Sequence, residues 1–332
     1  MTAGQEIISK LLAKYPSHGK MTIARIAYKE HPECWKNLDT CSQMVRAYTG
    51  AHGKDCRTKT ICERPHGKAG TNVFGRIPPA RNPFKTPDEA LQINGPAKML
   101  ILQDIHIPFH ARQPLATAID EGVRRNPGIV LMNGDALDAH GISFWQCDPR
   151  ERDFPGELKA MREFIAYLRG MFPKARIIYK WGNHEERYES YMFAKAPELL
   201  GVEDFELGNL LRFPQYGIEE VKEKRLIRGG DLNIVHGHEY KDGRSNPVNA
   251  ARTLFLRAKA YAFCGHSHQI SSHSDNDITG HSIATWSGGC LCLLRQRYTR
   301  FNNWRHGFAW EEIDKHNKFE LLNHTIKKGK IY

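Results

Sequence analysis

Five clusters of histidine, aspartate and asparagine constrain this chain more than any other feature of its sequence. Each cluster directly follows a short apolar run of the kind that forms a buried strand. These runs are residues 98–103, 129–132, 177–180, 232–235 and 261–264. Between them, residues 112–125, 157–172 and 246–260 have the apolar spacing of helices. Strands that alternate with helices predict an α/β fold.

The clusters themselves carry side chains that bind metal ions in proteins. They read Asp-Ile-His at 104–106, Asn-Gly-Asp at 133–135, Gly-Asn-His-Glu at 182–185, His-Gly-His at 236–238 and Gly-His-Ser-His at 265–268. One such cluster alone is more often a solvated turn or a buried structural histidine. Because ligands of α/β proteins bind at the carboxyl ends of the strands, five clusters there predict one shared metal site.

The donor set indicates a catalytic centre. Carboxylate, imidazole and amide oxygen without thiolate suit Mn²⁺, Fe²⁺ or Zn²⁺ rather than a closed structural zinc. Seven side chains are too many for one ion, so the sequence predicts two divalent ions that share a carboxylate, with Mn²⁺ favoured. Two such ions, about 3.5–4 Å apart, activate water and stabilise a phosphoryl transition state.

In content and order, the five motifs within residues 97–290 resemble the calcineurin-like metallophosphoesterase family. The resemblance implies a four-layer α/β/β/α sandwich with a dinuclear metal site at one edge. The ligands that it implies are Asp104, His106 and His268 for the first ion, Asn183, His236 and His266 for the second, and Asp135 as the bridge between them.

The same resemblance implies an enzyme that hydrolyses phosphodiester bonds through a metal-bridging hydroxide. His184, next to the expected ligand Asn183, would contact the phosphoryl oxygen or protonate the leaving oxygen. The Ser/Thr protein phosphatases of the family have Arg-Gly where this chain has Ala139 and His140. Protein phosphatase activity is therefore the less favoured alternative.

Other polar side chains lie beside the motifs. We expect them to line the pocket or to hold the ligands through hydrogen bonds. For His110, His140 and His238, the alternative is that they are non-catalytic residues of the pocket wall or the surface. The residues are His110, Asp138, His140, Glu185 and His238.

Positive charge is concentrated near the N-terminus. The whole chain has a formal net charge of +11, and residues 1–95 hold 15 Lys and Arg against 8 Asp and Glu, a net charge of +7. We interpret residues 1–63 as a small basic helical domain. Residues 64–96, rich in Gly, Pro and Asn, read as a linker or extended arm, and residues 97–332 as the metallophosphoesterase domain.

Two short helices are expected in the basic domain, one over residues 22–28 that ends near Pro32 and one over 39–48 capped by Asp39 or Thr40. Such a pair suits a helix-turn-helix that binds DNA, and a three-helix bundle with a solvated basic face is the alternative. The expected nucleic-acid contacts are Arg46, Lys54, Arg57 and Lys59.

These features favour a nuclease whose partner and substrate is nucleic acid, DNA rather than RNA. The alternatives are a phosphodiesterase or phosphatase for a small nucleotide-type phosphoester, and a DNA-binding regulator whose second domain senses metal. The sequence contains neither an apolar stretch long enough to span a membrane nor an export signal. We therefore expect a cytoplasmic protein without a membrane partner. The basic domain and residues 302–308 are similar to stand-alone phosphoesterases of phage genomes, which would place the protein in the host cytoplasm.

Overall fold

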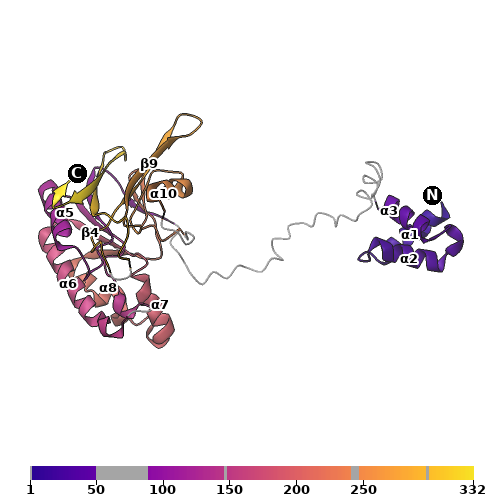
Figure 1. Cartoon of the computed structure of the whole chain (residues 1–332), viewed down its shortest axis with the longest axis horizontal. Helices are drawn as coiled ribbons and strands as arrows, with labels where there is room; N and C mark the ends of the chain where they lie inside the picture. The colour runs from indigo at the N-terminus through magenta and orange to yellow at the C-terminus, as the bar shows by residue number, and fades with distance from the viewer. Residues whose placement is uncertain (1, 50–88, 146–147, 241–246, 297–298) are drawn as a thin grey trace. The chain divides into compact units, whose positions relative to one another are not determined.

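The computed structural model describes residues 2–49, 89–145, 148–240, 247–296 and 299–332 (Figure 1). The chain divides into two compact units, residues 1–83 and 84–332. Three of the expected nucleic-acid contacts, Lys54, Arg57 and Lys59, lie outside the described residues.

The first unit is built from three helices, α1 (Ala3–Lys14), α2 (Lys20–Glu30) and α3 (Leu38–Tyr48), with a short 3₁₀ turn at Pro32–Cys34. Ile8, Ile23 and Val45, one from each helix, are fully buried in its core. The first of these helices is not among the two expected from the sequence. The N-cap of α3 is also corrected, because the Asn37 side chain accepts a hydrogen bond from the Thr40 N–H.

The connection between α2 and α3 is longer than a helix-turn-helix motif requires. It spans residues 31–37 and contains the 3₁₀ turn, whereas the motif joins its helices by about three or four residues. Arg46 lies exposed in the last turn of α3. The unit is therefore a three-helix bundle, and a role in DNA binding stays a proposal.

Two mixed sheets form the framework of the second unit. One has the strand order β1 (Leu91–Ile93), β6 (Ile227–Gly229), β7 (Leu232–Ile234), β8 (Ala262–Cys264), β10 (Ser282–Gly288) and β9 (Ile270–Asn276). The other has the order β13 (Lys330–Ile331), β12 (Phe319–Lys327), β11 (Gly307–Ile313), β2 (Ala97–Leu102), β3 (Ile129–Asn133), β4 (Arg176–Lys180) and β5 (Ile218–Val221). The main helices are α5 (Arg112–Arg125), α6 (Phe154–Met171), α7 (Glu186–Lys195), α8 (Leu207–Leu210), α9 (Phe213–Tyr216) and α10 (Ala250–Ala258).

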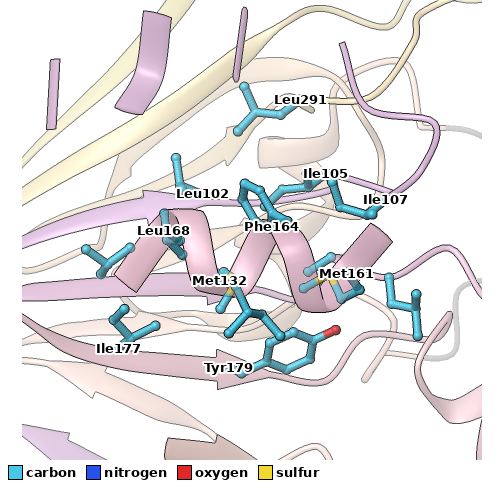
Figure 2. Close-up of a cluster of buried hydrophobic side chains, with 14 of the residues drawn as sticks. Leu102, Ile105, Ile107, Met132, Met161, Phe164, Leu168, Ile177, Tyr179 and Leu291 are labelled. Atoms are coloured by element: carbon cyan, nitrogen blue, oxygen red, sulfur yellow. The ribbon is translucent and has the colours of Figure 1, made fainter. Parts of the chain in front are cut away.

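Three apolar clusters show that these elements form four layers. On one face of the seven-stranded sheet, side chains of α6 such as Phe164 pack over Met132 and its neighbours (Figure 2). On the other face, Leu131 packs against Phe263 of the six-stranded sheet. Leu254 of α10 then covers the far side of that second sheet. The α/β/β/α sandwich expected from the sequence is confirmed.

The alternation of side chains along central strands explains this arrangement. In β2, Leu100 and Leu102 face the helices whereas Met99 and Ile101 face the second sheet. A strand buried on both faces must be apolar at every position, so it appears as a continuous hydrophobic run. The runs before the first three motifs are β2, β3 and β4, which pair in parallel.

The expected linker over residues 64–96 is corrected at its C-terminal end. Leu91–Ile93 form β1, which pairs in parallel with β6. The alternation of an apolar, a polar and an apolar residue suits a strand, but three residues are too short to stand out among the neighbouring Gly and Pro residues. Within the described residues, no helix has the length and apolar character needed to cross a membrane.

Candidate metal centre

Loops from both sheets meet at one edge of the sandwich. The loops after β2, β3 and β4 come from the seven-stranded sheet, and those after β7 and β8 from the six-stranded sheet. Because β7 and β8 also pair in parallel, each group of loops leaves its sheet at the same end. The five sequence motifs therefore meet in one place, as the sequence predicts.

The first group of donor atoms surrounds the Nε2 atom of His268. This atom lies 3.2 Å from Nε2 of His106 and 3.2 Å from Oδ1 of Asp104. Asp104 is fully buried, and His106 and His268 are nearly so. Two ring nitrogens and a carboxylate oxygen thus face one another in a space from which water is largely excluded.

The second group surrounds the Nε2 atom of His236. It lies 3.2 Å from Oδ2 of Asp135 and 3.3 Å from Oδ1 of Asn183. The donor atoms of His266, Asp135 and His236 all lie within 4.8 Å of one another. Oδ2 of Asp135 is also 3.8 Å from Nε2 of His106, so this carboxylate lies between the two groups.

The donor atoms fit divalent cations. Metal–nitrogen and metal–oxygen bonds of about 2.0–2.2 Å place neighbouring ligand atoms about 3.0–3.4 Å apart. The closest contacts within each group lie in that range. Burial disfavours a charged imidazole, yet Asp135 and Asp104 raise the pKa of His236 to about 10. The two carboxylates therefore favour a positive charge at His236, whereas burial and the neighbouring His236 lower the pKa of His266 to about 4.

Hydrogen bonds at the opposite ring nitrogens orient two of the histidines. Nδ1 of His106 lies 2.7 Å from Oδ1 of Asp138, and Nδ1 of His236 lies 2.9 Å from the carbonyl oxygen of Asn133. Each ring donates its Nδ1–H to that oxygen, which leaves the lone pair of Nε2 directed into the site. Asp138 thus orients the ring of His106, one of the candidate ligands.

Five of the seven candidate ligands have left-handed backbone conformations. Their φ angles lie between 50° and 63°, a region that residues other than glycine rarely adopt. Such strain clusters at functional sites and persists only where the surrounding structure enforces it. The five residues are Asp104, His106, Asp135, His266 and His268.

Two motif glycines allow the loops to approach each other closely. A Cβ atom on Gly134 would collide with the His236 ring, and one on Gly182 would collide with the Asp135 carboxylate. Gly134 also has a φ of +82°. Any side chain at either position would displace a candidate ligand.

Glu185 ties the third motif to the second. Its fully buried carboxylate accepts hydrogen bonds from the backbone N–H groups of residues 135, 136, 137 and 182, at 2.8 to 3.0 Å. It also accepts one from the Tyr179 hydroxyl at 2.7 Å. Burial and this carboxylate raise the pKa of Tyr179 well above its usual value, so the hydroxyl remains a donor.

His184 lies between the two groups, with a ring nitrogen within 4.8 Å of the donor atoms of His106 and Asp135. Its backbone N–H donates to Oδ1 of Asp135 at 2.9 Å, and its ring Nδ1 lies 2.8 Å from the carbonyl oxygen of Asp138. Its Nε2 atom is 3.8 Å from Oδ2 of Asp135 and 2.9 Å from Nη2 of Arg187. Although burial acts in the opposite direction, hydrogen bonds from His106 and His184 hold the pKa of Asp138 far below its usual range.

Three residues that contact the candidate site were not predicted from the sequence. Arg187 donates from Nη1 to the carbonyl oxygen of Asp138 at 2.9 Å and so reaches the site from α7. Glu239 accepts from the N–H groups of residues 236 and 237 and pairs with the buried Lys180 at 3.0 Å. Cys292 places its sulfur 3.7 Å from Nδ1 of His268. A glutamate directly after a histidine motif, as in both 182–185 and 236–239, was the available signal for Glu239.

Three expected pocket residues make no contact with the candidate ligands that would give them a defined role. His140 packs its ring against Phe109, and its backbone N–H donates to Glu157. Nε2 of His238 lies 3.0 Å from Oε1 of Glu186, and the centroid of the His238 ring lies 5.2 Å from that of His236. The Nδ1 atom of His110 is buried without a hydrogen-bond partner among the described residues.

Comparison with known proteins gives relatives from phages. The Gene 54 protein of Mycobacterium phage L5 is 27% identical over 241 residues, which cover 68% of this chain and 92% of the phage protein. The Gene 54 protein of Mycobacterium phage D29 is 26% identical, with the same coverage. No protein-family model matches the chain.

Solved structures with a similar fold include three proteins. Vps29 complexed with Zn²⁺ from Entamoeba histolytica is 13% identical, has a TM-score of 0.36 and covers 71% of this chain and 96% of its own. A dimetal phosphatase from Danio rerio is 10% identical, with a TM-score of 0.33 and coverage of 66% and 93%. The phosphoesterase Yfce from E. coli is 13% identical, with a TM-score of 0.32 and coverage of 68% and 98%. At such low similarity, the chemistry of this site must be judged from its own side chains.

Proposed function

We propose that this chain is a metal-dependent hydrolase of phosphodiester bonds and that it acts as a nuclease on DNA. The observation that carries the proposal is the convergence of imidazole, carboxylate and amide donors from five separate loops into two adjacent groups. Asp104, His106 and His268 would hold one ion and Asn183, His236 and His266 the other, with Asp135 shared. When bound, two divalent ions would lower the pKa of a bound water molecule and would stabilise the negative charge of the phosphate group.

His184 is the proposed proton donor. Its Nδ1–H is fixed on the Asp138 carbonyl oxygen, so Nε2 is the atom that can exchange a proton with the leaving oxygen. Arg187 donates a hydrogen bond from Nη2 to that same Nε2 atom, so Nε2 can carry a proton for the leaving oxygen only when Arg187 turns to a phosphate oxygen. In the Ser/Thr protein phosphatases, an arginine stands at the position of Ala139. We propose that Arg187 makes the contact with phosphate oxygens that an alanine at this position cannot make.

A polymeric substrate is supported by charge and by the relatives. Residues 1–83 hold 14 Lys and Arg against 6 Asp and Glu, so the first unit has a net charge of +8. A surplus of this size favours a polyanion such as nucleic acid. The phage proteins support a phage origin, where DNA is an available substrate. Mn²⁺ remains the favoured ion.

Cleavage assays with His184→Ala test this proposal. With Mn²⁺, the wild type should cut labelled DNA and hydrolyse bis(p-nitrophenyl) phosphate. The variant should retain its metal, and its rate should be about 10²–10⁴-fold lower. His316→Ala is the control, because His316 is exposed in the β11–β12 turn at the opposite end of the sheet. Hydrolysis of the small diester without DNA cleavage would favour a small nucleotide-type substrate. Full activity in His184→Ala would exclude its assigned role.

A further inference from the structure

We infer that residues 293–296 and 299–305 bind single-stranded nucleic acid next to the metal centre, an inference that rests on the proposed function. This segment combines exposed arginine and aromatic side chains with a complete lack of acidic ones. The sequence contains no Asp or Glu from residue 278 to residue 310. The segment is not part of the five metal motifs.

Both ends of the segment are attached to the loops that carry the candidate ligands. At its start, the Leu291 N–H donates to the carbonyl oxygen of Asp104 at 3.0 Å, and the Leu293 N–H donates to that of Phe109 at 2.9 Å. At its end, the Arg305 N–H donates to the carbonyl oxygen of His268 at 2.9 Å. A polymer bound along the segment would therefore lie beside the site where we expect cleavage.

Asn302 holds the segment in a defined shape. Its side-chain amide donates to the carbonyl oxygens of Leu294 and Thr299 at 2.6 and 2.8 Å, and its side-chain oxygen accepts from the Trp304 N–H at 3.0 Å. Side chains on a fixed loop lose less freedom when a ligand binds than those on a mobile one.

The aromatic side chains offer surfaces on which bases can stack. Phe301 is 94% exposed, so burial in the core does not account for its presence. Trp304 is partly exposed, and its ring centroid lies 4.1 Å from that of His268. Stacking on such side chains needs bases with a free face, which single strands provide and duplexes do not. This selects a single strand as the ligand.

The arginines supply the complementary charge. Arg295, Arg300 and Arg305 are exposed, and none of them forms an ion pair among the described residues. Free guanidinium groups bind phosphate oxygens and release counterions when they do so. Each of the three arginines should therefore add about 0.7 to the magnitude of the slope of log K against log salt for single-strand binding.

Binding of a fluorescein-labelled single-stranded oligonucleotide to the full-length protein in EDTA tests the inference without catalysis. Phe301→Ser should raise the Kd about tenfold, within the range for loss of one stacked base. Arg295→Ser combined with Arg300→Ser should lower the slope of log K against log salt by about 1.4. In Trp304→Phe, the oligonucleotide should still bind but should quench less of the tryptophan fluorescence.

Matched controls lie at the opposite end of the sandwich. Arg228 is exposed next to the β6–β7 turn, and Tyr167 is exposed near the C-terminal end of α6. Arg228→Ser and Tyr167→Ser should bind the oligonucleotide like the wild type. Equal affinity and slope in wild type, Phe301→Ser and the double arginine variant would overturn the inference.

Hydrolysis of bis(p-nitrophenyl) phosphate with Mn²⁺ separates this inference from the proposed function. The small diester has no polymer to align, so Phe301→Ser and the double arginine variant should hydrolyse it at the wild-type rate. Failure of the wild type to hydrolyse it would count against the proposed function alone. Wild-type hydrolysis together with unchanged oligonucleotide binding in the variants would remove only the nucleic-acid surface.

Discussion

Asp135 is the residue on which both groups of the metal centre depend. Its Oδ2 atom lies 3.2 Å from Nε2 of His236 and 3.8 Å from Nε2 of His106, and its Oδ1 atom accepts from the His184 N–H. The carboxylate therefore supplies charge to both groups and also positions the proposed proton donor. At the scale of single residues, this is where a small change should have the largest effect.

We expect Asp135→Asn to weaken metal binding at both positions, because the amide retains the shape but removes the shared negative charge. Metal content after dialysis against limiting Mn²⁺, measured by inductively coupled plasma mass spectrometry, should fall well below the wild-type value. Asp231→Asn is the control, since Asp231 is exposed and pairs with Lys318 on the surface. Wild-type metal content in Asp135→Asn would exclude the shared position.

Single elements are held in place by buried carboxylates. Glu185, at the start of α7, connects the loop after β4 to the loop after β3 through four backbone N–H groups. Glu311, on β11, faces the interior between the two sheets and has no hydrogen-bond partner for either oxygen among the described residues. The first carboxylate stabilises the site, and the second carries a cost in stability at neutral pH.

Glu185→Gln should destabilise the second unit by about 2–5 kcal/mol, because an amide N–H₂ replaces one acceptor and leaves buried N–H groups unpaired. Chemical denaturation without metal measures the loss independently of catalysis. Glu219→Gln should change stability by less than about 1 kcal/mol, since Glu219 forms a half-exposed ion pair with Arg176. A similar small change in both variants would show that Glu185 does not organise these loops.

Glu311 should make stability depend on pH. Burial raises its pKa from 4.5 to about 8, so the folded state binds this proton more tightly than the unfolded state does. Its contribution therefore falls as pH rises from about 4.5 to 8, on the order of 4 kcal/mol over that interval. The difference in free energy of unfolding between wild type and Glu311→Met, measured at pH 5 and pH 8, should change by that amount. A difference independent of pH would mean that the carboxylate is solvated or paired.

On the scale of the whole molecule, charge and chemistry are divided between the two units. The first unit has a net charge of +8 and its own core, whereas residues 84–332 contain the candidate metal centre and carry a net charge of +3. If the proposed function holds, the basic unit increases the local concentration of a polyanionic substrate near the metal centre.

A fragment of residues 84–332 should retain metal binding and hydrolysis of the small diester but lose most affinity for duplex DNA. If Arg46, Lys54, Arg57 and Lys59 contact phosphates, the slope of log K against log salt should decrease by about 3 to 4. Fluorescence anisotropy with labelled duplex DNA at several salt concentrations measures this slope. An unchanged slope would assign duplex binding to the second unit.

Local pattern in the sequence determined most of the layered fold and the candidate ligands. Continuous apolar runs predicted β2, β3 and β4, because strands covered on both faces cannot alternate. The spacing of apolar residues predicted α5 with the observed bounds. Histidine and aspartate at strand ends predicted the site, since parallel strands bring their carboxyl ends to one edge of a sheet.

Tertiary structure alone decided the features that depend on contacts between distant segments. Arg187, Glu239 and Cys292 reach the site through folding, and no local pattern marks an arginine on α7 as a neighbour of His184. The left-handed conformations of Asp104 and His106 likewise follow from neighbouring loops rather than from residue preference. The sequence determines which side chains are present at each strand end, and only packing determines their distances and the partners that orient them.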